Sequence, residues 1–175
     1  MRVLLVLFIV AVIATGTSGA DLRKGYSGFT TTGYYFHVHD TIDSEDGSFS
    51  GGLIPVGLSF GYSVGAIFFG AGFDYLAGTG DYESLASPYV ETRFFFRKES
   101  RFSPCASLAV GPHFLTDHVG VMARIGAGVD YRASNNFGGY AEVGYLGVLP
   151  DVSWAGDYSY WVGNIGLRVG VAATF

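Results

Sequence analysis

Charge, cysteine and long apolar runs are all scarce in this sequence. Charged residues make up 14% of the 175 residues, against roughly 25% in an average soluble domain. The one cysteine, Cys105, excludes an internal disulfide. The formal net charge of −5 argues against nucleic-acid binding, which needs a basic surface. After residue 20 no apolar run reaches the roughly 20 residues of a transmembrane helix, which excludes helical membrane spans there.

Apolar residues are nevertheless abundant, and they are dispersed. The chain is 49% hydrophobic and 17% aromatic, and it contains 27 glycines. Apolar residues at every second position suit a β-strand with one apolar face. A sheet in lipid must pair all its backbone polar groups, and a closed barrel does so. The composition therefore favours an all-β membrane barrel over an ordinary soluble domain.

The first 20 residues have the pattern of a secretory signal peptide. Arg2 precedes an apolar core from Val3 to Ala14, and the segment ends in small residues. A membrane anchor is the alternative, but this apolar core is shorter than a spanning helix. We therefore expect residues 1–20 to be a cleaved signal peptide and residues 21–175 to form one barrel domain.

Eight segments of the expected mature chain alternate between apolar and polar or small residues, with turn-forming clusters between them. Each is near the roughly 9 to 11 residues with which a tilted strand crosses a bilayer. The sequence therefore predicts an eight-stranded antiparallel up-and-down transmembrane β-barrel. The predicted strands cover residues 28–39, 53–62, 66–76, 88–97, 105–114, 119–131, 137–147 and 160–175.

The charged residues of these segments share one face of each strand, opposite the aliphatic and aromatic residues. An eight-stranded barrel leaves an interior just wide enough for side chains to fill. A buried charge without a partner costs roughly 3–5 kcal/mol, so we expect a neutral ion-pair network that plugs the lumen. A narrow polar channel for small solutes is the alternative. The charged face carries Asp74, Glu91, Arg93, Arg97, Arg124, Asp130, Glu142 and Arg168, and the network is predicted for Glu91, Arg93, Arg124, Glu142 and Arg168.

Aromatic residues and connection lengths predict the orientation of the barrel. Aromatic residues gather near both rims, as in outer-membrane barrels. The connections at one rim are short, and those at the other are longer, except at residues 115–118. Short turns belong in the periplasm. The first and the last residue of the barrel domain are therefore both expected on the periplasmic side, with Arg132 beside a periplasmic turn. The expected outer girdle is Phe36, Tyr75, Phe114, Tyr145 and Trp161, and the inner girdle is Phe60, Tyr62, Phe96, Tyr131, Phe137 and Phe175.

The last eleven residues carry the most informative pattern in the chain. From Ile165 to Phe175, apolar side chains alternate with small residues and Arg168, and the sequence stops on an aromatic. This stretch resembles the closing strand of bacterial outer-membrane barrels, whose pattern Gly170, Ala173 and Phe175 match. The resemblance implies that these three residues form a C-terminal assembly signal, read by the barrel-assembly machinery.

The expected mature chain as a whole resembles the small eight-stranded outer-membrane barrels, a group that includes the membrane domain of OmpA, OmpX and the opacity-type surface proteins. The resemblance implies an integral, monomeric protein of the bacterial outer membrane, in contact with lipid and lipopolysaccharide. It implies a structural or adhesin-like role, with an external ligand or surface bound by the loops. It implies no reaction, because this fold carries several functions.

Candidate catalytic and metal-binding residues are few. His37 and His39 flank the outer end of the first predicted strand, and His113 and His118 flank that of the fifth, on the opposite side of a barrel. Ser107 lies roughly 20 Å along the strand from His113, too far for a nucleophile and its base. We expect no catalytic residue, no metal site and no cofactor. An enzyme that modifies lipid A remains a further alternative.

Overall fold

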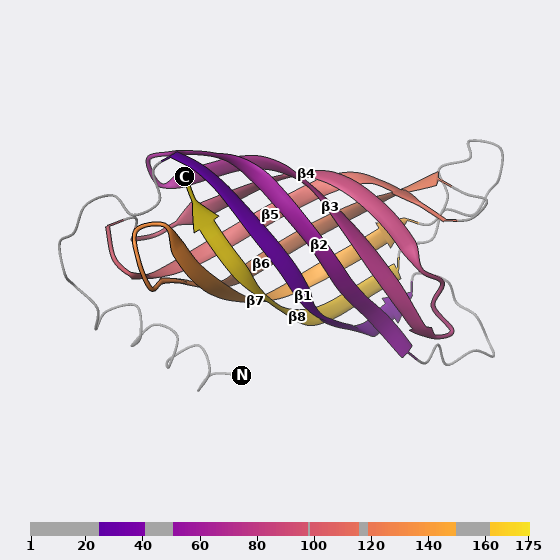
Figure 1. Cartoon of the computed structure of the whole chain (residues 1–175). Helices are drawn as coiled ribbons and strands as arrows, with labels where there is room; N and C mark the ends of the chain where they lie inside the picture. Colours follow the sequence, from indigo (N-terminus) through magenta and orange to yellow (C-terminus); the bar gives the residue numbers. More distant parts are fainter. Residues whose placement is uncertain (1–24, 41–50, 98, 116–118, 150–161) are drawn as a thin grey trace, which may run out of the picture.

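The described part of the chain forms eight β-strands (Figure 1). The structure is a computed structural model, and it describes residues 25–40, 51–97, 99–115, 119–149 and 162–175. In that part of the chain, no helix is long and apolar enough to cross a membrane. The strands are β1 (Gly25–Asp40), β2 (Gly51–Val64), β3 (Ile67–Gly80), β4 (Leu85–Phe95), β5 (Phe102–Phe114), β6 (Val119–Arg132), β7 (Phe137–Leu149) and β8 (Val162–Thr174).

The eight strands form a closed barrel. Each strand pairs antiparallel with its neighbours in the chain, and β1 pairs antiparallel with β8. The predicted eight-stranded up-and-down barrel is thereby confirmed. Ser27 near the start of β1 lies opposite Thr174 at the end of β8. The start of the first strand and the end of the last strand therefore lie at the same rim of the barrel, as Figure 1 shows. We refer to this rim as the terminal end and to the opposite rim as the loop end.

Side chains alternate between two contrasting environments, because successive residues of a strand point to opposite faces. The outward residues are largely apolar and many are exposed, among them Leu58 at 62% and Ile125 at 60% of their full area. The inward residues include charged side chains, and Arg168 is 0% exposed. Soluble proteins place most of their charges on the surface. The barrel is therefore inverted relative to a soluble fold.

Several strands are longer at the loop end than the sequence pattern predicted. Strand β3 continues to Gly80 and β4 begins at Leu85, so the connection predicted for residues 77–87 shrinks to residues 81–84. The hydroxyl of Thr79 accepts a hydrogen bond from the amide of Gly52 at 3.0 Å and donates one to the Gly52 carbonyl at 3.1 Å. These bonds hold this end of β3 against β2, although its Gly and Thr residues look turn-like in the sequence.

Two local features shape the strand ends. The ladder between β1 and β8 shifts register between His37 and His39, which leaves Val38 as an irregularity in β1. Such a bulge bends a strand and re-aims its side chains. At the terminal end, β2 and β3 are joined by a tight turn in which Gly65 has a φ of +60°, a conformation that favours glycine.

Three layers of side chains follow one another along the barrel axis inside the lumen. On β4, the order from the terminal end is Phe95, then Arg93 and Glu91, then Tyr89 and Leu85. Apolar layers thus lie on both sides of a charged layer. The terminal apolar layer is Phe29, Phe68, Phe95, Cys105, Tyr140 and Ala172. The loop-end apolar layer is Tyr35, Leu53, Leu76, Leu85, Tyr89, Ala109, Met122, Leu146, Val148 and Val162.

Candidate functional site

The most distinctive site is the charged layer at mid-height in the lumen, where ion pairs link six side chains in a continuous chain. The chain of alternating charge runs in the order Arg93, Glu91, Arg124, Asp74, Arg168, Glu142. Three carboxylates face three guanidinium groups, so the layer is electrically neutral. Each of these side chains is almost completely buried. Charges removed from water need such partners, since an unpaired one is strongly destabilising.

The first half of this chain of ion pairs joins β4 to β6 and β3. The guanidinium of Arg93 lies 3.2 Å from Glu91, which also lies 3.4 Å from Arg124. Arg124 then makes the shortest pair of the layer, at 2.7 Å from Asp74. The hydroxyl of Ser59 on β2 also donates a hydrogen bond to Glu91.

The second half of this chain of ion pairs extends to β8 and β7. Arg168 lies 3.6 Å from Asp74 and 3.4 Å from Glu142. Arg168 also donates a 2.9 Å hydrogen bond to the hydroxyl of Thr31 on β1, which in turn bonds the hydroxyl of Tyr140 at 2.5 Å. The charged layer therefore cross-links strands on all sides of the barrel.

All five charged residues that the sequence predicted for the network meet in this layer, and the structure adds Asp74 at its centre. Asp74 shares a carboxylate oxygen between Arg124 and Arg168 and so joins the two halves of the chain. The sequence placed Asp74 on the lumen face but did not include it among the paired residues. Its depth relative to the two arginines depends on strand register, which alternation alone does not give.

Aromatic rings support the arginines of the layer. The guanidinium carbon of Arg93 lies 4.2 Å from the ring centre of Phe29 and 4.6 Å from that of Tyr140. Arg124 lies 4.8 Å from the ring centre of Tyr89. Cations within about 6 Å of an aromatic ring face are attracted to it. The apolar layers thus contact the charged layer through favourable cation–π geometry.

A second buried ion pair lies near the terminal end. Arg132 pairs with Asp130 at 3.1 Å and donates a 2.8 Å hydrogen bond to the hydroxyl of Thr174. Thr174 also bonds the hydroxyl of Ser27 at 3.1 Å, across the closure between β8 and β1. The prediction that Arg132 lies beside a periplasmic turn missed this burial, because β6 extends to Arg132 and its alternation points this side chain inward. Arg97, which the sequence placed on the lumen face, is only partly buried.

At the loop end, Tyr82 reaches across the barrel mouth. Tyr82 follows β3, yet its hydroxyl donates a 3.0 Å hydrogen bond to the side-chain oxygen of Asn164 on β8. The same hydroxyl is hydrogen-bonded to Nδ1 of His37 on β1. The Tyr82 ring packs against the loop-end apolar layer. Within the connection between β3 and β4, the Tyr82 side chain therefore lies over that layer, whereas Asp81, Glu83 and Ser84 are exposed.

Some of the residues weighed for catalysis or metal binding lie within the described part of the chain. Ser107 and His113 are both buried on β5. No group of three or more His, Cys, Asp or Glu residues in the described part of the chain is arranged to hold a metal ion. The side chains of His39 and His118 lie outside the described residues, as do Trp161 and the predicted signal peptide of residues 1–20.

The C-terminal residues singled out in the sequence complete the barrel. Ala173 lies opposite Gly28 on one side and Phe137 on the other. The amide of Phe175 donates a 2.8 Å hydrogen bond to the Tyr26 carbonyl, and the Phe175 side chain is 76% exposed. The terminal aromatic thus stands outside the barrel wall at the terminal end.

These features define a class: a closed eight-stranded antiparallel barrel, apolar outside, with buried ion pairs in its lumen. The crystal structure of Neisserial surface protein A (NspA) is similar to this fold, with a TM-score of 0.62 and 15% sequence identity. The match covers 87% of this chain and 98% of that chain. At this identity the likeness establishes the shared fold alone. No protein-family model and no curated protein matches the sequence.

Proposed function

We propose that this protein is an integral outer-membrane barrel with a closed lumen and a structural or surface-interaction role of the adhesin type. The observation that carries the proposal is the inversion of the barrel, with apolar side chains outside and a neutral charged layer inside. In water the exposed apolar belt would be unfavourable by about 25 cal/mol per Å². In lipid the same belt is matched to its surroundings.

The lumen layers favour a closed barrel over the alternative of a narrow channel. A solute or ion on the barrel axis would have to pass two packed apolar layers and break ion pairs such as that between Arg124 and Asp74. Eight-stranded barrels have little room inside once side chains fill them. We therefore assign interaction with the surroundings to the loops and the outer surface, and we expect no catalytic activity.

The proposed orientation places the terminal end in the periplasm and the loop end outside the cell. Turn length supports the direction, and the aromatic residues support a barrel that crosses a membrane. The β2–β3 turn at the terminal end spans only residues 65–66, and short turns are typical of the periplasmic side. Exposed aromatic residues stand toward both rims, such as Tyr62 and Phe137 at the terminal end and Phe36 and Phe114 at the loop end.

The proposed partners follow from this placement. Lipid and lipopolysaccharide would contact the apolar belt, and an external ligand or surface would contact the loops of a monomeric barrel. The assembly machinery would read the closing strand through Gly170, Ala173 and Phe175, of which Phe175 is the most exposed. The predicted signal peptide of residues 1–20 would direct the chain to secretion.

Epitope insertion tests this function. A tag inserted after Gly47, within the connection between β1 and β2, should be labelled by antibody on intact cells. The matched control is the same tag inserted after Gly65 in the β2–β3 turn, which should be labelled only after the cells are opened. Recovery of the protein outside the outer-membrane fraction, or surface labelling of the Gly65 tag, would contradict the proposal.

A further inference from the structure

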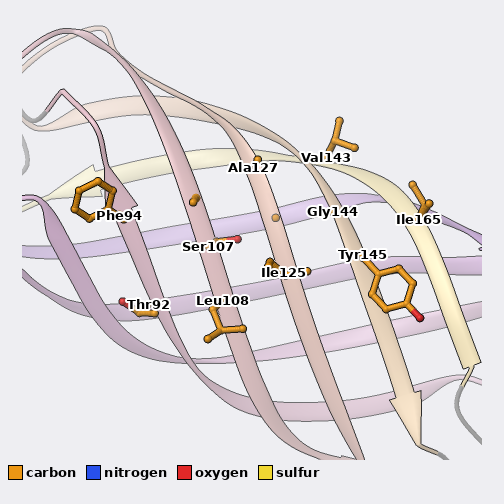
Figure 2. Close-up of a pocket in the computed structure, with 12 residues that line it drawn as sticks. Thr92, Phe94, Ser107, Leu108, Ile125, Ala127, Val143, Gly144, Tyr145 and Ile165 are labelled. Atoms are coloured by element: carbon orange, nitrogen blue, oxygen red, sulfur yellow. The ribbon is translucent and has the colours of Figure 1, made fainter. Parts of the chain in front are cut away.

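An apolar groove crosses the outside of the barrel over β4 to β8, away from the lumen (Figure 2). Its volume is about 660 Å³. Figure 2 shows Thr92 and Phe94 at one end and Tyr145 and Ile165 at the other, with Ala127 and Ile125 between them. A smaller depression of about 410 Å³ over β3 to β5 shares Thr92 and Leu108 with it. No charged residue lines the larger groove.

The groove exists because small residues interrupt the bulky outer surface. Ala106 and Ala127 are register partners on β5 and β6, while Phe94 and Val143 continue the same row on either side. Gly126 and Gly144 contribute only backbone to the groove floor, because both positions face the lumen. The exposed side chains of Leu108 and Ile125 form a second row beside it. The result is a depression bounded by larger side chains.

We infer that this groove is a binding site for one acyl chain of a membrane lipid. The inference rests on the proposed function, since it requires this face to lie in a bilayer. The groove is continuous with the apolar belt that lipid would cover, and its uncharged lining matches a methylene chain. The hydroxyl group of Tyr145 stands at the end nearer the loop end, where a lipid headgroup would lie.

The dimensions fit one extended chain. The row Thr92, Leu108, Ile125, Tyr145 and Ile165 follows successive register pairs over five strands. With neighbouring strands about 4.8 Å apart, this row is about 19 Å long. One leaflet of a bilayer core is about 15 Å thick, and a chain that crosses it at roughly 45° travels about 21 Å. An acyl chain inclined along the groove would thus be contained over most of its length.

A second copy of the chain is a poorer occupant. Stable protein interfaces use roughly 20 to 30 residues from each partner, whereas the groove is lined by 12 residues. A partner would need a ridge to fill the depression, and two-fold dimers present the same patch to each other. The concave part of this face therefore fits a slender ligand better than a copy of itself.

Lipid retention tests the site. The full chain is expressed, extracted from membranes in mild detergent, exposed to vesicles of phosphatidylethanolamine with sixteen-carbon chains, and analysed by native mass spectrometry. We expect the barrel to retain one lipid. In Ala127→Phe the new ring fills the groove, and displacement of about two methylene groups should reduce the bound fraction about tenfold. Ala71→Phe is the matched control, because Ala71 is also exposed on the outer face, on β3.

The outcomes separate the two proposals. A folded barrel recovered from the outer membrane without retained lipid, or equal retention in both variants, overturns the acyl-chain site and leaves the proposed function intact. A dimer that Ala127→Phe abolishes overturns it in favour of self-association. Failure of the parent chain to enter the outer membrane contradicts the proposed function, and the site with it. If Ala127→Phe does not fold by heat-modifiability, Ala106→Leu replaces it in the same comparison.

Discussion

At the scale of single residues, the fold depends on how completely its buried charges are paired. Arg124 and Arg168 both approach one oxygen of Asp74, so this carboxylate links two halves of the charged layer. Glu142, by contrast, forms an ion pair only with Arg168 among the residues that the structure describes. Removal of a buried partner leaves the opposite charge without compensation, which costs far more than an exposed pair contributes.

The end of the ion-pair chain provides the first prediction. Glu142→Ala removes one of the two carboxylates that pair with Arg168 in the described structure, so the free energy of unfolding should fall by roughly 3–5 kcal/mol. Urea unfolding of the barrel in detergent or lipid measures this change. Glu83→Ala is the control, because Glu83 is exposed between β3 and β4. An unfolding midpoint that Glu142→Ala leaves unchanged would show that the ion pairs do not hold the barrel.

The centre of the chain should matter more than its end. Asp74→Asn and Glu142→Gln each neutralise one carboxylate with almost no change of shape. The first weakens two ion pairs and the second weakens one, so Asp74→Asn should destabilise the barrel more in the same urea titration. Equal losses, or the reverse order, would argue against Asp74 as the link between the two halves.

At the scale of strands, the alternation of residues predicted all eight elements and which face of each is apolar. It did so because a strand in a barrel wall has one consistent environment on each side. It missed the ends: β3 continues through Thr79 and Gly80, and the bulge at Val38 has no mark in the sequence. Strand ends depend on cross-strand bonds such as those of Thr79 with Gly52, which a single segment does not reveal.

One lumen glycine should tolerate no side chain. A Cβ atom on Gly126 would lie 2.5 Å from the carboxyl carbon of Glu142, which the pair with Arg168 holds in place. Gly126→Ala should therefore destabilise the barrel by about 1–3 kcal/mol through overpacking. The control is Gly28→Ala on β1, where the nearest atom would be 3.6 Å away. Thermal unfolding followed by circular dichroism compares the two, and equal stability would contradict the packing described.

The closure between β1 and β8 depends on buried polar contacts of Thr174. Thr174→Val keeps the shape of the side chain but removes the hydroxyl that accepts from Arg132 and bonds Ser27. Loss of an acceptor for a buried guanidinium should cost about 1–3 kcal/mol. The temperature at which the folded band disappears on a heat-modifiability gel should fall. Thr32→Val, on the exposed outer face of β1, should leave that temperature nearly unchanged.

At the scale of the whole molecule, the three lumen layers decide what the barrel can do. The sequence predicted which residues face inward, and the structure brings the five predicted charged residues into one layer. The sequence did not predict that an apolar layer lies on each side of the charged layer, or that Arg132 is buried. Those features depend on the relative depth of residues on different strands. Register sets that depth, so it emerges only when the barrel closes.

Whether the lumen is closed can be measured by single-channel conductance of the refolded chain without residues 1–20 in a planar bilayer. A heat-modifiability gel of the same preparation establishes that the barrel has folded. We expect a folded barrel that is electrically silent, since packed apolar layers enclose the charged layer. Steady conductance through a folded barrel would contradict the closed lumen and make small-solute transport the better reading of this protein.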